Sequence, residues 1–220
     1  MGEVINLDLM RSLLSTARPK YEEIAQRVKF EHERKPCKSY DQANLLGKVS
    51  KHYLRCLLES APQQFQILRK ITEKDSYYST DNGCQLLIRT TALGQDKSDV
   101  CTIDALVEVQ ERKVLIDIRA CTWANVLGNY FNKRKEYNSI LDAVFGKDAY
   151  DRVLAVCNDV APTRDEVGRS AEKTFHRGVH IVKLPLTLIQ LEKVAVNIGH
   201  QYGLFKKTEK SQPTPKTSNP

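Results

Sequence analysis

Apolar and polar positions alternate in two neighbouring stretches near the middle of the chain, between Val100 and Ala120. In the second stretch, the apolar residues at positions 114, 116 and 118 fall on one face of a strand, because strand side chains alternate with period two. Leu115, Asp117 and Arg119 fall on the opposite face. The short polar turn at Gln110–Arg112 predicts that the two strands form a hairpin.

The first of these strands also carries acidic residues among apolar ones. Asp104, Leu106 and Glu108 share a face by the same rule. If the strands pair, carboxylates of both strands and the guanidinium of Arg119 gather at one place on the sheet. Burying Asp117 and Arg119 in so apolar a strand is costly, so a compensating partner is expected. That partner is either an ion pair between the strands or a metal-dependent active site.

The pattern along the rest of the chain predicts helices and strands in alternation. Helical spacing of apolar residues predicts helices over 7–14, 21–30, 40–60, 122–145, 163–174 and 185–202. Strands are predicted over 84–91, 152–157 and 179–184, with 65–71 either a strand or a short helix and with loops at 29–38, 72–83 and 94–99. This order predicts an α/β fold with a mixed central sheet flanked by helices, antiparallel at its start and parallel at its end.

Composition divides the chain into three parts. Residues 1–38 are expected to form a helical N-terminal extension, and residues 39–205 the α/β domain. Residues 206–220 are polar, with three prolines and many Lys, Ser and Thr, and predict a disordered basic tail.

The net charge of the chain favours a polyanionic partner. The formal charge is +7 and the sequence pI is about 9.0, and nucleic acid, DNA or RNA, is the commonest partner of such a protein. A homodimer or a larger protein complex is also open.

Several other classes of protein lack their sequence signatures here. None of the six cysteines forms a CxxC pair, so zinc ribbons and redox motifs are disfavoured and an intracellular, reducing compartment (cytoplasm or nucleus) is expected. No signal peptide and no apolar run of about 18 residues is found, so no membrane span is expected. The motifs of P-loop, dinucleotide-binding and α/β-hydrolase enzymes are absent.

Asp104 on one central strand and Asp117-Ile118-Arg119 on the next, between helices, resemble the PD-(D/E)xK (restriction-endonuclease-like) nuclease superfamily. This resemblance implies a Mg²⁺ or Mn²⁺ ion held by Asp104, Asp117 and the carbonyl of Ile118, which fits the preference of these ions for oxygen ligands. Arg119 stands where the family has lysine. Arginine stays protonated and cannot act as a base, but it can stabilise charge that develops on a phosphate.

Further residues are candidates for the same site. Lys133 or Lys135 could supply the missing lysine, and Glu59 could be the extra acid that many family members place on the first domain helix. Glu108 is a second possible acid, although it lies about 13 Å from Asp104 along an extended strand. Some members of the superfamily carry a histidine on their leading helices, which draws attention to His52.

Two features point to contact with nucleic acid, and each has an ordinary alternative. Lys133, Arg134 and Lys135 either contact the phosphate backbone or form a solvated helix face. Tyr130 either stacks on bases or belongs to the core.

The leading hypothesis from the sequence is a metal-dependent nuclease that cleaves phosphodiester bonds of DNA or RNA. Asp104 and Asp117 would hold the metal, with Arg119 stabilising the phosphate. The alternative is a catalytically inactive module of the same fold that binds nucleic acid or assembles a larger complex. A plain ion pair in an unrelated α/β fold is the third interpretation.

Overall fold

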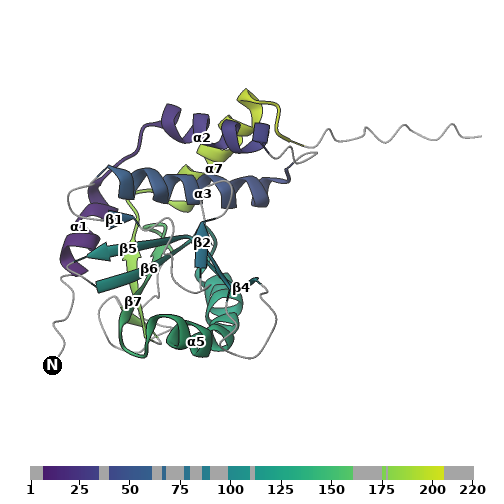
Figure 1. The fold of residues 1–220 in the computed structure, drawn as a ribbon. Helices are drawn as coiled ribbons and strands as arrows, with labels where there is room; N and C mark the ends of the chain where they lie inside the picture. The colour runs from purple at the N-terminus through teal and green to yellow at the C-terminus, as the bar shows by residue number, and fades with distance from the viewer. Residues whose placement is uncertain are drawn as a thin grey trace, which may run out of the picture.

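The computed structural model describes residues 7–34, 40–60, 66–67, 77–79, 86–89, 99–109, 112–160, 175–176 and 178–205. Within these residues the chain forms a mixed α/β fold with two sheets and flanking helices (Figure 1). The predicted helix over 163–174 and the predicted tail over 206–220 lie outside the described residues. None of the described helices is both long and apolar enough to cross a bilayer.

The larger sheet has six strands and a mixed arrangement. Its order is β1 (Gln66–Ile67), β5 (Ala105–Val109), β6 (Arg112–Arg119), β7 (Tyr150–Val156), β9 (Val179–Lys183) and β8 (Phe175–His176). Strands β5 and β6 form the predicted antiparallel hairpin, whereas β6, β7 and β9 run parallel. The prediction of a mixed sheet that begins with an antiparallel hairpin is therefore confirmed. The expectation that it ends in parallel strands holds for β6, β7 and β9, whereas the last pair, β8 with β9, is antiparallel.

A second, antiparallel sheet contains β2 (Tyr77–Ser79), β3 (Leu86–Arg89) and β4 (Asp99–Ile103). Strand β3 falls within the strand predicted over 84–91. Strand β2 falls where a polar loop is predicted, so the loop prediction is wrong for these residues. The two adjacent tyrosines favour a strand, and β2 pairs with the apolar strand β3, Tyr77 opposite Ile88.

The helices largely follow the predicted spans. They are α1 (Leu7–Thr16), α2 (Tyr21–Arg34), α3 (Gln42–Glu59), α4 (Trp123–Asn125), η1 (Val126–Phe131), α5 (Asn132–Phe145) and α7 (Leu188–Gln201). Helix α3 begins where Asp41 caps it, because the Asp41 carboxylate accepts the Asn44 N–H at 2.7 Å. Helix α2 continues to Arg34, into the stretch predicted as a loop, so that part of the prediction is wrong.

The helices form layers on both sides of the larger sheet (Figure 1). Helix α3 packs on the face of β6 that carries Val114, Ile116 and Ile118, and α2 and α7 cover the other side of α3. On the opposite face, Leu106 and Leu115 pack against residues of α5. Helices α1 and α2, predicted as an extension, contribute buried residues to the same core cluster as α3 and the sheet.

Candidate functional site

The candidate site lies where the chain passes from one sheet to the other. Strand β4 pairs with β3 up to Ile103, whereas β5 begins at Ala105, opposite Ile116 of β6. Asp104 is the single residue between them. The continuous strand predicted through Asp104 is therefore wrong, because the chain bends there and changes its partner strand.

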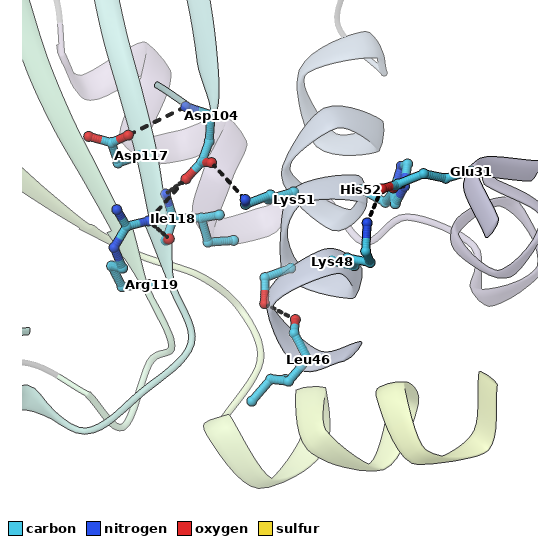
Figure 2. Close-up of polar contacts among 10 residues, drawn as sticks. Glu31, Leu46, Lys48, Lys51, His52, Asp104, Asp117, Ile118 and Arg119 are labelled. Carbon is cyan, nitrogen blue, oxygen red and sulfur yellow. Dashed lines mark hydrogen bonds and ion pairs between the residues drawn. The ribbon is translucent and has the colours of Figure 1, made fainter. Parts of the chain in front are cut away.

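The two aspartates replace the backbone hydrogen bonds that β5 would otherwise make beyond this bend. The Asp104 carboxylate accepts the Ile118 N–H through Oδ2 at 3.0 Å. The Asp117 carboxylate accepts the Asp104 N–H through Oδ1 at 3.4 Å (Figure 2). Buried backbone N–H groups require such partners, so each acid has a structural task at the end of the β5–β6 ladder. The expected meeting of Asp104 and Asp117 on neighbouring segments is observed.

Two cations reach Asp104 from different elements. The Arg119 guanidinium, on β6, donates through Nη1 to Asp104 Oδ2 at 3.2 Å and to the Ile118 carbonyl oxygen at 2.7 Å. Lys51, on α3, places its Nζ 3.8 Å from Asp104 Oδ1 (Figure 2). Lys51 is not among the residues that the sequence predicts for the site. The available signal is its position in the predicted helix, between Val49 and the apolar residues Tyr53 and Leu54.

Tyr130 completes the surroundings of Asp117. Its hydroxyl donates to Asp117 Oδ2 at 2.9 Å, and the Arg119 guanidinium lies 5.1 Å from the centre of its ring. Tyr130 lies in the π-helical turn η1, a kind of turn often found at functional sites, together with the buried Phe131. The Tyr130 ring is buried, so the expectation that it stacks on bases is corrected and the core interpretation holds.

Burial separates the acids from the cations. The side chains of Asp104 and Lys51 are 3% and 27% exposed, and that of Arg119 is 37% exposed. Asp117 is also buried. Burial, followed by the negative charge of Asp117, raises the pKa of Asp104, although Arg119 and Lys51 oppose this effect. Burial acts to lower the pKa of Arg119, but Asp117 and Asp104 outweigh it and the pKa is raised.

The donors around these oxygens bear on whether a divalent cation fits. Asp104 Oδ2 accepts two hydrogen bonds, Oδ1 faces Lys51, and both Asp117 oxygens accept hydrogen bonds. The Ile118 carbonyl accepts from Arg119. Among the described residues, no group of three His, Cys, Asp or Glu side chains is placed to hold a metal ion. As they are arranged, these residues do not fit Mg²⁺ or Mn²⁺.

The structure does not bring the two additional acids to this site. Glu59 pairs with Arg27 at 2.5 Å and with Arg55 at 2.9 Å. It lies eight residues beyond Lys51 on α3, about 12 Å along the helix axis. Glu108 lies at the far end of β5, opposite Lys113. Neither is therefore an extra acid beside Asp104 in this arrangement.

The remaining candidates have different outcomes. Lys133, Arg134 and Lys135 belong to α5, but their side chains lie outside the described part of the structure, so their roles stay predictions. His52 is buried between α2 and α3, where its Nε2 lies 2.7 Å from Glu31 Oε2 (Figure 2). Lys48 also pairs with Glu31. His52 thus belongs to the contact between these helices.

No family model, no curated protein sequence and no solved structure matches the chain. Function is therefore inferred from the geometry of Asp104, Asp117, Arg119 and their neighbours.

Proposed function

We propose that this protein is a nucleic-acid-binding module with a restriction-endonuclease-like fold, in which the acid pair supports the site and does not catalyse cleavage. This proposal depends on one observation, that the negative charges of the site are buried and its positive charges lie nearer the surface. The carboxylates of Asp104 and Asp117 are buried, whereas the cations Arg119 and Lys51 are partly exposed. A ligand that approaches the site therefore meets positive charge first.

Phosphate is the ligand chemistry that suits this arrangement. Guanidinium and ammonium groups are the usual phosphate partners in nucleic-acid-binding proteins. Only Nη1 of Arg119 is used in the hydrogen bonds described above, and arginine carries five N–H donors. The net charge of +7 adds a long-range attraction to any polyanion.

Binding of DNA and RNA oligonucleotides in EDTA, followed by fluorescence anisotropy over a series of salt concentrations, tests this proposal. We expect the logarithm of the affinity to fall linearly with the logarithm of salt concentration. Lys51→Ala and Arg119→Met should each weaken binding and reduce the slope by about 1. Arg112→Ala is the matched control, because Arg112 lies at the other end of β6 and pairs with Asp151.

Two outcomes would contradict the proposal. One is binding that does not respond to salt, since phosphate contacts release counterions. The other is an equal effect of Arg112→Ala and Arg119→Met, which would show that overall charge matters and the site does not. The triple variant Lys133→Ala, Arg134→Ala, Lys135→Ala tests the separate prediction for α5.

Metal-dependent cleavage is the second candidate function. It is favoured by the convergence of Asp104, Asp117 and Ile118 at the bend between β4 and β5, where the chain reaches β6, which is the arrangement that the resemblance implies. Incubation of DNA and RNA with Mg²⁺ or Mn²⁺ tests it directly. Cleavage that Asp117→Ala abolishes, in a variant that still folds, would replace the binding proposal with this one.

A further inference from the structure

The Arg119 guanidinium lies on the atoms that a divalent cation would need. Its Nη1 is 3.2 Å from Asp104 Oδ2 and 2.7 Å from the Ile118 carbonyl oxygen. These are two of the three ligands that the resemblance to the nuclease superfamily implies for the metal. A guanidinium and a metal ion cannot both occupy this position, because Mg²⁺ requires oxygen ligands at about 2.1 Å.

The charges lead to the same conclusion. Asp104 and Asp117 carry two negative charges at most, and Arg119 and Lys51 already supply two positive charges. Arginine cannot lose its proton in a protein. A divalent cation entering beside Arg119 would therefore leave two excess positive charges in a largely buried place, against one when Arg119 is removed, so Arg119 makes metal binding less favourable.

We propose that the Arg119 guanidinium takes the place of a divalent cation in this site, so that removing it uncovers a Mn²⁺ site. Asp104, Asp117 and the Ile118 carbonyl supply the protein ligands of that uncovered site, and water supplies the others. The inference rests on the part of the proposed function that assigns the acid pair a supporting role without metal. It does not depend on nucleic-acid binding, which is measured separately in EDTA.

Titration of the full chain with Mn²⁺, followed by the electron paramagnetic resonance signal of the free ion, tests this inference. We expect Arg119→Ala and Arg119→Met to bind one Mn²⁺ at least about tenfold more tightly than the unsubstituted protein. Mn²⁺ should correspondingly raise the melting temperature of these variants and leave that of the parent unchanged. The methionine variant keeps an apolar stem above the Tyr130 ring, which Arg119 covers.

Two further variants locate the effect. Adding Asp117→Asn to Arg119→Met should remove the acquired Mn²⁺ binding, because one of the proposed ligands is lost. Arg112→Ala should behave as the parent does. Arg112 is on the same strand, and its pairing with Asp151 makes it a control for the loss of one arginine charge.

Three results would overturn the inference. The first is Mn²⁺ binding by the parent protein at equal affinity and dependent on Asp117. The second is a folded Arg119→Met variant that gains no affinity for Mn²⁺. The third is an Arg119→Met variant that stays unfolded at saturating Mn²⁺, which would show that the metal cannot substitute for the guanidinium. Failure of oligonucleotide binding in EDTA would leave all three tests unaffected and would concern the proposed function alone.

Discussion

Two acids, Asp104 at the sheet bend and Glu59 on α3, each form ion pairs with cations of the described part of the chain. Arg119 and Lys51 lie beside Asp104, and Arg27 and Arg55 lie beside Glu59. Their pKa values nevertheless move in opposite directions, upward for Asp104 and downward for Glu59. The presence of opposite charges nearby therefore does not by itself decide the direction in which the pKa of an acid moves.

Burial and the presence of a second acid account for the difference. Burial raises the pKa of both groups, but the Asp104 side chain is only 3% exposed whereas Glu59 is 23% exposed. Asp117 then raises the pKa of Asp104 further. Both arginines beside Glu59 donate hydrogen bonds to it, whereas at Asp104 Arg119 donates one and Lys51 lies 3.8 Å away. Glu59 thus stabilises the contact between α2 and α3, whereas the charge on Asp104 opposes folding.

The largest effect on stability is expected from substitution of Glu59, the acid whose charge stabilises the fold. Glu59→Gln should lower the free energy of unfolding at pH 7 by about 2 kcal/mol, because the ion pairs with Arg27 and the buried Arg55 lose their charge. Since the pKa of Glu59 is lowered from 4.5 on folding, this contribution is present above pH 4.5 and is lost as the pH falls through the folded value. Chemical denaturation at several pH values measures it.

A control for this prediction is Glu33→Gln. Glu33 pairs with Lys29 on the surface of α2, where both side chains are at least half exposed, so we expect a change below about 0.5 kcal/mol. Equal losses for Glu33→Gln and Glu59→Gln would contradict a special role for Glu59.

The next largest effect on stability is expected from the Tyr130 hydroxyl, the neutral hydrogen-bond donor to Asp117. Tyr130→Phe removes the hydroxyl that donates to Asp117 Oδ2 and should cost about 1.5 kcal/mol of stability, as expected for a hydrogen bond to a charged group. Thermal and urea denaturation measure the loss.

Tyr53→Phe is the matched control for the tyrosine substitution. Tyr53 is buried to a similar degree, and its hydroxyl has no hydrogen-bond partner among the described residues. Its removal should change stability little or increase it. A loss in Tyr53→Phe as large as that in Tyr130→Phe would mean that the Asp117 hydrogen bond does not matter.

The smallest effect, and one of opposite sign, is expected at Asp104. Asp104→Asn should raise the free energy of unfolding at pH 7 by about 1 kcal/mol, because the neutral amide removes a buried negative charge that lies next to Asp117. The amide oxygen can still accept the Ile118 N–H, and the partly exposed Lys51 can turn away towards solvent. The same denaturation experiments measure the gain.

The pH dependence of the free energy of unfolding provides an independent check on the sign of the Asp104→Asn effect. Because the pKa of Asp104 is raised from 3.8 on folding, the parent protein loses stability through this group as the pH rises from 3.8 through the folded value. The advantage of Asp104→Asn should therefore shrink as the pH is lowered towards 3.8. If Asp104→Asn destabilises the protein at pH 7, Asp104 resembles Glu59 and the contrast between the two acids fails.

The sequence by itself determined most of the helices and strands and the faces of the central strands. The alternation along β6 set Leu115, Asp117 and Arg119 on one face, and this face lies opposite the one that packs on α3. The short turn between β5 and β6 fixes the pairing of these strands, and this pairing brings Asp104 and Asp117 together. These features follow from period-two alternation and turn length, which are properties of neighbouring residues.

Only the tertiary structure decided which groups surround the acids. Lys51 precedes Asp104 by 53 residues in the sequence (104 − 51). No local pattern specifies that the Lys51 ammonium reaches the bend at Asp104. The break at Asp104 depends on β4 pairing with β3, which again is a contact between distant segments. Folding brings charged groups and carbonyls from distant parts of the chain to the acids. The burial, the hydrogen bonds and the pKa of a buried acid depend on these neighbours, and the order of residues alone does not specify them.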